Sequence, residues 1–487
     1  MTELDLQRNF APEHLQHIHI MGICGTGMAA LAGMLQQSGY TVTGSDNHVY
    51  PPMSEFLVEL GIPVLEGYGP QNLASHPDLV IVGNVITRKN PEAEALAHLG
   101  LPYLSFPQAL HHFFIRSRTS LVVAGTHGKT TTCSLLATAL YRAKLDPTFM
   151  IGGIIREFGG NFRLGNGNYF VAEGDEYDTA FFDKGSKFLH YQPQIAIITS
   201  IEFDHADIFA DLAAIKRSFA RFIALIPENG LLIANYDDAN VRELVAEARC
   251  PVQSYGINPA CDWSLVDVVM QDGLSWFTPC HRGQRLERLG VRLPGHHNCF
   301  NSLAVTALMR HLGVPLATIG EGLASFAGVK RRQEVRGVVN GVTVIDDFAH
   351  HPTAVRETLA ALRMAYPGQR LLVVFEPRTN TSRRSIFQQE YTLAFDQADE
   401  VILREPVPLA NIELHDHFSS RQLAADLSNR QGLSARSFED TEQILRFLQT
   451  ELRSGDVVAI LSNGGFDYIH RRLLDQLETN PPRPVTT

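Results

Sequence analysis

Residues 120–131 read Ser-Leu-Val-Val-Ala-Gly-Thr-His-Gly-Lys-Thr-Thr, and this stretch decides the class of fold. Its apolar part, Leu121–Ala124, has the length and composition of a strand that is buried on both faces of a parallel sheet. The loop that follows leads into a helical pattern over Lys129–Arg142. A buried strand, a short loop and a helix in this order predict an α/β unit with a parallel sheet.

The loop after this strand has the composition of a phosphate-binding loop. Backbone N–H groups and the dipole at the start of a helix attract phosphate, Lys129 can neutralise its β and γ oxygens, and Thr130 can ligate Mg²⁺. The loop is shorter than a Walker A loop, because Val123 stands five residues before Gly128 where that motif has glycine. A tight turn that merely contains a lysine is the structural alternative. We expect ATP or GTP to bind here, through Gly125, Thr126, His127, Gly128, Lys129, Thr130 and Thr131.

The chain is long enough, at 487 residues, for about three domains. Short apolar runs alternate with helical patterns from the N-terminus, start again at residue 120 and start a third time near residue 342. Between residues 252 and 292 the polarity alternates with period two, which predicts antiparallel strands added to the second unit. We therefore predict an α/β protein with three domains, at residues 1–114, 115–328 and 329–487.

The composition excludes several classes of protein. Apolar residues make up 45% of the chain and charged residues 19%, as in ordinary globular proteins. The formal net charge is −11 and no run of five basic residues occurs, so we expect neither nucleic acid nor an anionic membrane as a partner. The apolar runs are far shorter than the roughly 20 residues of a membrane span, so we expect no membrane insertion.

The N-terminus and the cysteines favour a cytoplasmic location. Residues 1–12 carry Glu3, Asp5 and Arg8 and lack the apolar core of a secretory signal. The six cysteines never occur with the CxxC spacing of zinc and redox sites. We expect them to be reduced thiols.

A second glycine cluster, Gly-Ile-Cys-Gly-Thr-Gly at residues 22–27, follows the first predicted strand. Asp46 comes 24 residues after Gly22, where an acidic residue often contacts a ribose hydroxyl. Because the spacing departs from the GxGxxG pattern of NAD-binding loops, we favour another nucleotide diphosphate over NAD. A purely structural turn is the third possibility.

Acidic and imidazole side chains cluster at residues 173–178 and 202–207, each time after a predicted strand. Because the carboxyl ends of parallel strands converge on the crevice that holds the phosphate loop, these groups can hold Mg²⁺ on the phosphates. For any single one, a solvated loop carboxylate is the structural alternative. Of three His-His pairs, none with zinc-site spacing, His350-His351 matters most because Asp346-Asp347 precede it at the end of a predicted strand.

Together these motifs resemble those of the Mur ligases, ATP-dependent amide-forming enzymes of peptidoglycan assembly. The resemblance implies an N-terminal Rossmann-like UDP-binding domain, a central P-loop ATPase domain and a C-terminal Rossmann-like domain. It spans all three predicted domains in order and rests on residues 125–131, 173–178, 204–205, 295–298, 331–332 and 346–347.

Within that family the chain resembles the members that join UDP-N-acetylmuramate to the tripeptide L-alanyl-γ-D-glutamyl-meso-diaminopimelate in peptidoglycan recycling. The related L-alanine ligases typically show Asp-Asp-Tyr-Gly-His-His-Pro and Pro-His-Arg-Tyr-Ser-Arg-Thr. Here residues 346–352 read Asp-Asp-Phe-Ala-His-His-Pro, and residues 377–383 read Pro-Arg-Thr-Asn-Thr-Ser-Arg. The second difference favours a larger acceptor. The alternative within the family is a UDP-N-acetylmuramate:L-alanine ligase.

The resemblance also implies the chemistry. The carboxylate of UDP-N-acetylmuramate attacks the γ-phosphate of ATP, giving an acyl phosphate and ADP, and the amine of the acceptor then displaces phosphate. The implied catalytic residues are Lys129, His205, His350 and Arg378. The implied ligands of Mg²⁺ are Thr130 and Glu173 for one ion and His205 for a second.

Further binding residues follow from the same resemblance. Asn298 would contact adenine, Arg332 the phosphates and Asp347 the ribose. The implied UDP-binding residues are Gly22, Gly25, Thr26, Gly27, Ser45 and Asp46. The implied acceptor-binding residues are Arg378, Arg383 and Arg384.

Two alternatives come from other classes of protein. An NAD-dependent dehydrogenase would rest on the glycine cluster at residues 22–27, and a non-enzymatic nucleotide switch would rest on the phosphate loop alone. The partners that we expect are UDP-N-acetylmuramate, ATP and the murein tripeptide.

Overall fold

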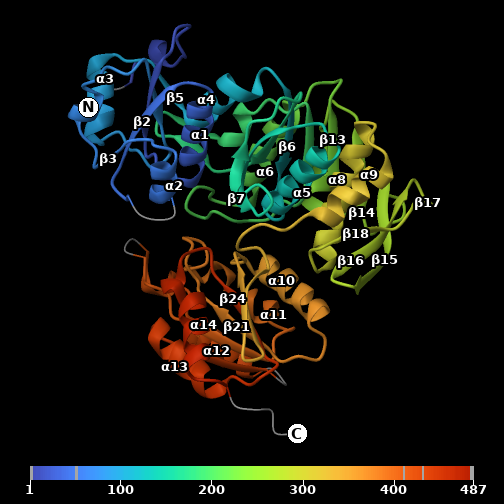
Figure 1. Cartoon of the computed structure of the whole chain (residues 1–487). Helices are drawn as coiled ribbons and strands as arrows, with labels where there is room; N and C mark the ends of the chain where they lie inside the picture. Colours follow the sequence, from blue (N-terminus) through green and yellow to red (C-terminus); the bar gives the residue numbers. More distant parts are fainter. Residues whose placement is uncertain (1–3, 50–52, 410–411, 430–432, 483–487) are drawn as a thin grey trace.

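The structure is a computed structural model that describes residues 4–49, 53–409, 412–429 and 433–482. The chain folds into three α/β domains, each built on its own main sheet, as the sequence predicted (Figure 1). The blue N-terminal domain lies beside the green and yellow central domain, and the orange and red C-terminal domain lies below them in this view. The boundaries after residues 114 and 328 stay a prediction.

The N-terminal domain is a parallel sheet in the order β3-β2-β1-β4-β5. Its strands are β1 (His17–Met21), β2 (Thr41–Asp46), β3 (Val64–Glu66), β4 (Leu79–Val82) and β5 (Tyr103–Ser105), and its helices are α1 (Thr26–Gln37), α2 (Met53–Glu59), α3 (Pro91–Leu99) and α4 (Phe106–Leu110). The strand order reverses between β1 and β4, and ligands of doubly wound sheets bind beside the carboxyl ends of such strands. The glycine cluster follows β1 and therefore lies at this crevice.

The central domain has a long mixed sheet in the order β17-β16-β15-β14-β13-β12-β6-β9-β7-β8, with β18 on β16. Its strands are β6 (Thr119–Ala124), β7 (Thr148–Ile155), β8 (Gly160–Arg163), β9 (Tyr169–Gly174), β12 (Ile195–Ile198), β13 (Leu231–Asn235), β14 (Val252–Gly256), β15 (Trp263–Gln271), β16 (Leu274–His281), β17 (Gln284–Arg285) and β18 (Leu289–Val291), with a separate hairpin of β10 (Asp178–Ala180) and β11 (Asp183–Ser186). Its helices are α5 (Lys129–Arg142), α6 (Leu212–Ala224), α7 (Ala239–Val245), α8 (His296–His311) and α9 (Leu316–Ser325).

The prediction of antiparallel strands between residues 252 and 292 is confirmed for β15 to β18. It is wrong for β14, which pairs in parallel with β13 and with β15. The reason is the connection: α7 crosses over between β13 and β14, and such a crossover returns the chain in the same direction.

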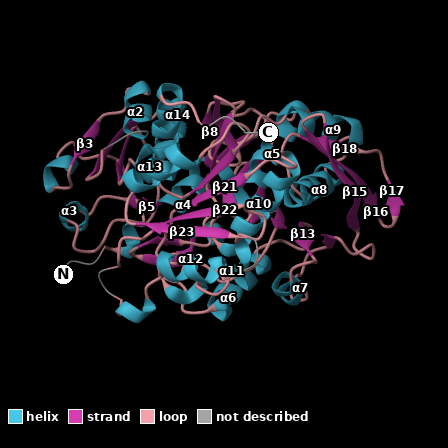
Figure 2. Cartoon of the chain, turned by 90° about the horizontal axis from the view of Figure 1, so that it is seen from below, coloured by secondary structure: helices cyan, strands magenta, loops and turns pink. Residues whose placement is uncertain are grey.

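The C-terminal domain has a sheet in the order β19-β20-β24-β21-β22-β23, parallel except for the hairpin of β19 and β20. Its strands are β19 (Glu334–Val339), β20 (Val342–Asp347), β21 (Leu371–Phe375), β22 (Glu400–Arg404), β23 (Ser434–Phe438) and β24 (Val457–Leu461), and its helices are α10 (Pro352–Ala365), α11 (Tyr391–Ala394), α12 (Ser420–Ser428), α13 (Thr441–Glu451) and α14 (Ile469–Thr479). Figure 2 shows the layer of strands with α13 and α14 on one side and α11 and α12 on the other. Separate apolar clusters fill the two faces.

The N-terminal and central domains share an apolar core. Helix α1 packs on β7 and β8, and Gly33 of α1 leaves room for the ring of Phe162. One cluster of buried side chains runs from α1 and α4 to Met150 and the rings of Phe188 and Phe219. Among the described residues, no helix combines the length and the apolar character that a membrane span needs.

Candidate functional site

The phosphate loop joins the end of β6 to the start of α5, as the sequence predicted. Gly128 begins the helix in the left-handed conformation, with φ 79°. Gly125 has φ 138°, and a Cβ at this position would collide with the side chain of Thr199. The loop is held against the segment after β12, since Ser200 accepts from the backbone N–H of Thr126 (2.8 Å) and of His127 (3.0 Å).

Lys129 lies inside the loop and is paired with a buried acid. Its Nζ donates to the carbonyl oxygen of Gly125 at 2.5 Å and to Oε2 of Glu176 at 2.8 Å. Burial opposes the charge on Lys129, but the carboxylates of Glu176 and Asp175 outweigh that effect and raise its pKa. The loop therefore keeps a cation in place where a phosphate would arrive.

Two predicted metal ligands lie in contact. The Thr130 hydroxyl donates to Oε1 of Glu173 at 2.9 Å, and Oε2 of the same carboxylate accepts from the N–H of Gly152 at 2.8 Å. Hydroxyl and carboxylate oxygens are hard donors, which Mg²⁺ prefers. The residues present therefore fit the predicted ion.

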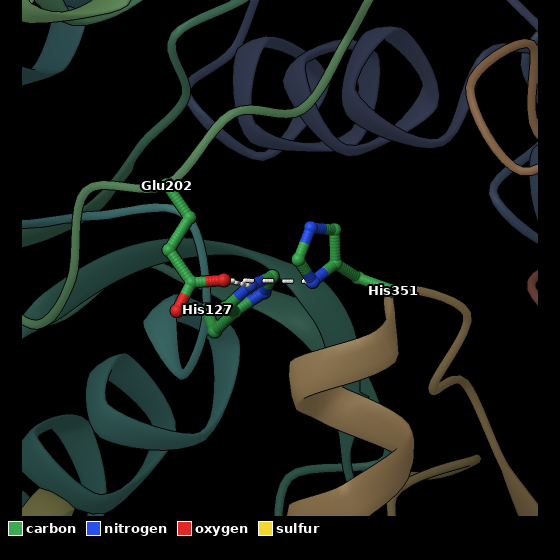
Figure 3. A group of neighbouring side chains, drawn as sticks. All are labelled: His127, Glu202 and His351. Atoms are coloured by element: carbon green, nitrogen blue, oxygen red, sulfur yellow. Dashed lines mark hydrogen bonds and ion pairs between the residues drawn. The ribbon is translucent and has the colours of Figure 1, made fainter. Parts of the chain in front are cut away.

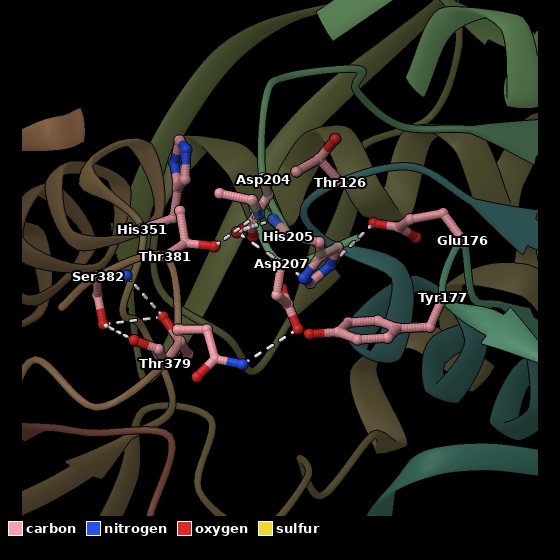
Figure 4. Close-up of polar contacts among 12 residues, drawn as sticks. Thr126, Glu176, Tyr177, Asp204, His205, Asp207, His351, Thr379, Thr381 and Ser382 are labelled. Atoms are coloured by element: carbon pink, nitrogen blue, oxygen red, sulfur yellow. Dashed lines mark hydrogen bonds and ion pairs between the residues drawn. The ribbon is translucent and has the colours of Figure 1, made fainter. Parts of the chain in front are cut away.

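The third predicted ligand, His205, faces a different carboxylate. Its Nε2 lies 3.3 Å from Oε1 of Glu176, and its ring packs on Tyr177 with 4.2 Å between ring centroids (Figure 4). Its backbone has φ 56°, a conformation that is rare outside glycine and clusters at functional sites. Burial opposes protonation of His205, but its contact with Glu176 and the charge of Asp204 raise its pKa.

A cavity of about 750 Å³ opens between the central and C-terminal domains. Its lining gathers predicted nucleotide contacts from three parts of the chain: His127, Gly128, Thr131, Asn298, Arg332 and Asp347. This volume suits a nucleotide-sized ligand.

Arg332 and Asp347 are the members of this group that come from the C-terminal domain, and each forms hydrogen bonds with neighbouring residues. One guanidinium nitrogen of Arg332 lies 3.3 Å from the Thr130 hydroxyl, so this side chain reaches the phosphate loop across the domain boundary. Asp347 accepts from the backbone N–H groups of Gln333 (2.7 Å) and Ala349 (2.8 Å). Burial raises the pKa of Asp347.

The glycine cluster of the first domain is organised by the end of β2. Gly22, with φ 80°, donates its N–H to the carbonyl of Ser45 at 2.8 Å. The N–H of Cys24 donates to Oδ2 of Asp46 at 2.9 Å. Gly27 lies on the ring of Phe106, and the Thr26 carbonyl faces Asn161 of the central domain. The predicted UDP-binding residues thus line one turn.

The predicted acceptor residues follow β21 in a loop over residues 378–384, called here the acceptor loop. Thr381 accepts from the N–H of Ala206 at 3.1 Å, and Asn380 donates to Asp207 at 3.1 Å. Figure 4 accordingly shows Thr379, Thr381 and Ser382 beside Asp204 and Asp207. The acceptor loop therefore lies against the segment that carries His205.

The arginines of this loop differ in their surroundings. Arg378 is about half exposed, lies 3.9 Å from Glu376 and covers Gly464, where a Cβ would collide with it. Arg383 donates to Asn380 at 3.2 Å. Among the described residues, the Nε atoms of Arg383 and Arg384 are buried without a hydrogen-bond partner. His350 has Nδ1 3.0 Å from the carbonyl of Phe348, and burial lowers its pKa.

Two residues near the chemistry were given no role from the sequence. Glu176 links Lys129 to His205, and buried Asp204 has its pKa lowered because the charges of His205 and His350 outweigh the effect of burial. Both stand inside the acidic segments noted above. The sequence pattern could identify each acidic segment. Which carboxylate of the segment reaches the site depends on how strands β9 and β12 are placed in the sheet.

The comparisons with known proteins agree over most of the chain. Residues 17–118 match the profile described as "Mur ligase family, catalytic domain", residues 123–309 the Mur ligase middle domain, and residues 331–464 the "Mur ligase, glutamate ligase domain". Two proteins named UDP-N-acetylmuramate–L-alanyl-γ-D-glutamyl-meso-2,6-diaminoheptandioate ligase are similar to this chain. The one from Haemophilus influenzae is 40% identical, over 95% of this chain and 100% of its own length, and the one from Escherichia coli is 41% identical, over 94% and 98%.

A UDP-N-acetylmuramate–L-alanine ligase from Acetivibrio thermocellus is 35% identical over 93% of this chain and 94% of its own. The crystal structure of a murein peptide ligase from Psychrobacter arcticus superposes with a TM-score of 0.70 and 36% identity, covering 95% of this chain and 99% of the other. The alternatives of a dehydrogenase and of a nucleotide switch are excluded, since the matching proteins are ATP-dependent ligases that form C–N bonds. The chain is a member of the Mur ligase family.

Proposed function

We propose that this ligase joins UDP-N-acetylmuramate to the tripeptide L-alanyl-γ-D-glutamyl-meso-diaminopimelate, in peptidoglycan recycling. The observation that carries the proposal is the similarity, over nearly the whole chain, to ligases named for this acceptor. The acceptor loop supports it, because guanidinium groups bind the carboxylates that a tripeptide brings and that free alanine has in smaller number.

ATP binds in the cavity between the central and C-terminal domains. Lys129 and Arg332 approach the phosphate loop from opposite domains and supply positive charge to the β and γ phosphates. Arg331 is not available for this role, because its guanidinium donates to the carbonyls of Ser462 and Gly464, both at 2.6 Å. Asn298 and Asp347 lie at the same cavity and contact the adenosine part of the nucleotide.

Thr130 and Glu173 would hold Mg²⁺, and His205 would be a ligand of a second ion. When bound, Mg²⁺ would neutralise the charge that the phosphates carry during transfer. The chain's own residues set the alignment. Thr130 lies in the first turn of α5 and Glu173 near the end of the neighbouring strand β9, so both donors lie beside the phosphate loop.

The two chemical steps follow from this alignment. The carboxylate of UDP-N-acetylmuramate attacks the γ-phosphorus, ADP leaves, and an acyl phosphate forms. The acceptor amine then attacks the acyl carbon, and inorganic phosphate leaves. His350 and the acceptor loop lie beside Asp204 and His205, so the acceptor is oriented next to the phosphate loop. Because the bound acceptor has already lost its translational and rotational freedom, the activation barrier for attack by its amine is lower.

The route can be tested with UDP-N-acetylmuramate labelled with ¹⁸O in its carboxylate. An acyl phosphate predicts that one labelled oxygen passes to inorganic phosphate for each UDP-N-acetylmuramoyl-tripeptide formed. Mass spectrometry of phosphate and of the nucleotide product measures both. Unlabelled phosphate alongside normal product would refute the acyl phosphate, and absence of the tripeptide product would refute the proposed acceptor.

A further inference from the structure

A second cluster of ligand-type side chains lies where the central and C-terminal domains meet. His127 belongs to the phosphate loop, Glu202 follows β12, and His351 caps the N-terminus of α10. One ligand atom from each lies within 4.8 Å of the other two (Figure 3). In the described part of the chain, this is the one group of three or more His, Cys, Asp or Glu side chains with such spacing.

The distances suit a tetrahedral cation. Nε2 of His127 lies 3.2 Å from Oε2 of Glu202, and Nδ1 of His351 lies 3.6 Å from the same oxygen. Two ligands at zinc distances and a tetrahedral angle are about 3.3 Å apart. Two of the three ligand pairs therefore already lie near the separation that one ion needs, and the third pair lies within 4.8 Å.

The neighbouring groups orient these ligands. Nε2 of His351 lies 3.2 Å from the carbonyl oxygen of Phe203, so this nitrogen donates its proton there and Nδ1 presents a lone pair to Glu202. Metal-binding histidines commonly donate their second N–H to a carbonyl in this way. The Thr353 hydroxyl donates to Oε2 of Glu202 at 2.8 Å, and the Thr353 N–H, 3.3 Å from Nδ1, is the contact that an ion would replace.

We propose that His127, Glu202 and His351 bind a divalent transition-metal ion of the zinc class, which fastens the C-terminal domain to the central domain. The two imidazoles distinguish this site from the oxygen donors Thr130 and Glu173. Imidazole ligands favour zinc-class ions, whereas hydroxyl and carboxylate ligands favour Mg²⁺. The inference depends on the cluster's geometry and not on the identity of the acceptor.

The direct test is calorimetric titration of the metal-free, nucleotide-free full chain with Zn²⁺ in millimolar Mg²⁺. Wild type is expected to bind one Zn²⁺ per chain. Glu202→Gln and His351→Gln, one from each domain, are expected to weaken binding at least tenfold, or about 1.4 kcal/mol. His311→Gln, which changes an exposed histidine at the end of α8, is the matched control and should bind like wild type.

Absorption of the Co²⁺-loaded chain identifies the ligands. Nitrogen and oxygen ligands give d–d bands without the intense charge-transfer band of a thiolate. Circular dichroism shows whether each variant folds, and either folded variant suffices for the comparison. Failure of wild type to bind Zn²⁺ stoichiometrically, wild-type affinity in a folded Glu202 or His351 variant, or a thiolate band would each overturn the site.

Hydrogen exchange tests whether the ion joins the domains. Zn²⁺ should slow amide exchange around both His127 and His351 in wild type, and around neither in His351→Gln. Protection confined to the phosphate loop would overturn the bridging role, since a bridging ion must restrain both sides.

Discussion

Lys129 and Glu176 form a buried ion pair at the centre of the site, and the pair makes a prediction about catalysis. Lys129→Met keeps an unbranched side chain but removes the cation from the phosphate loop. Single-turnover formation of ADP should fall at least 100-fold, about 2.7 kcal/mol of transition-state stabilisation. Rapid-quench measurement of ADP checks it.

Lys184→Met serves as the control for this variant, because the Lys184 side chain is 69% exposed where it pairs with Asp178. It should retain wild-type ADP formation. Near-normal ADP formation by a folded Lys129→Met variant would remove this lysine from the mechanism.

Glu173 and His205 make a prediction about the metal requirement. Glu173→Gln and His205→Ala should each raise the Mg²⁺ concentration for half-maximal activity several-fold, with partial rescue by excess Mg²⁺, because each removes one proposed ligand. Exposed Glu228 supplies the control variant, Glu228→Gln. If neither variant shifts the Mg²⁺ titration, these side chains only support the loops around them.

Strand β22 begins with a buried acid, Glu400, whose surroundings predict an effect on stability. Burial and then the charge of Glu451 raise the pKa of this carboxyl, although Arg370 and Arg436 oppose the shift. A raised pKa in the folded state favours folding only below the ordinary glutamate pKa, and this contribution is lost as pH rises through the folded-state value. At pH 7 the ionised carboxylate therefore destabilises the C-terminal domain.

Glu400→Gln should accordingly raise the melting temperature at pH 7 and give no gain at pH 4. Differential scanning calorimetry measures both, with the exposed Glu390→Gln as control. A lower melting temperature at pH 7 would mean that the ion pairs with Arg370 and Arg436 outweigh burial.

The acceptor loop makes a prediction about substrate choice. Of the single changes Arg378→Ala, Arg383→Ala and Arg384→Ala, at least one should lower kcat/KM for the tripeptide tenfold or more, about 1.4 kcal/mol, with little change in the KM for ATP. Arg421→Ala, at a 78% exposed side chain, is the control. Full tripeptide activity in all three variants would place the acceptor elsewhere.

Elements with a strong local pattern could be predicted from the sequence, and contacts between elements could not. The run Leu121–Ala124 and the helix after it are decided by residues adjacent in sequence, so strand, loop and helix were predicted correctly. The parallel pairing of β14 with β13 depends on the crossover through α7. Alternating polarity along a strand does not indicate whether the strand pairs in parallel or antiparallel. His127, Glu202 and His351 meet only because two domains pack together.

The two domain interfaces of the molecule differ in kind. The N-terminal domain meets the central domain through buried apolar side chains of α1 and α4. The contacts between the central and C-terminal domains around the site include ion pairs and hydrogen bonds, such as Arg156 to Glu334 at 3.0 Å and Arg332 to Thr130 at 3.3 Å, beside the ring of Phe203, which packs on the C-terminal core. Polar interfaces within a chain commonly allow relative motion. We therefore expect opening for substrate entry at the second interface.

The most direct test of the whole account is acceptor preference of the wild-type enzyme. With saturating ATP, Mg²⁺ and UDP-N-acetylmuramate, ADP release and the nucleotide product are measured at varied tripeptide and at varied L-alanine. The account predicts acceptor-dependent ADP release, with kcat/KM for the tripeptide at least tenfold above that for alanine. A higher kcat/KM for alanine, or ADP release that does not depend on an acceptor, would contradict it.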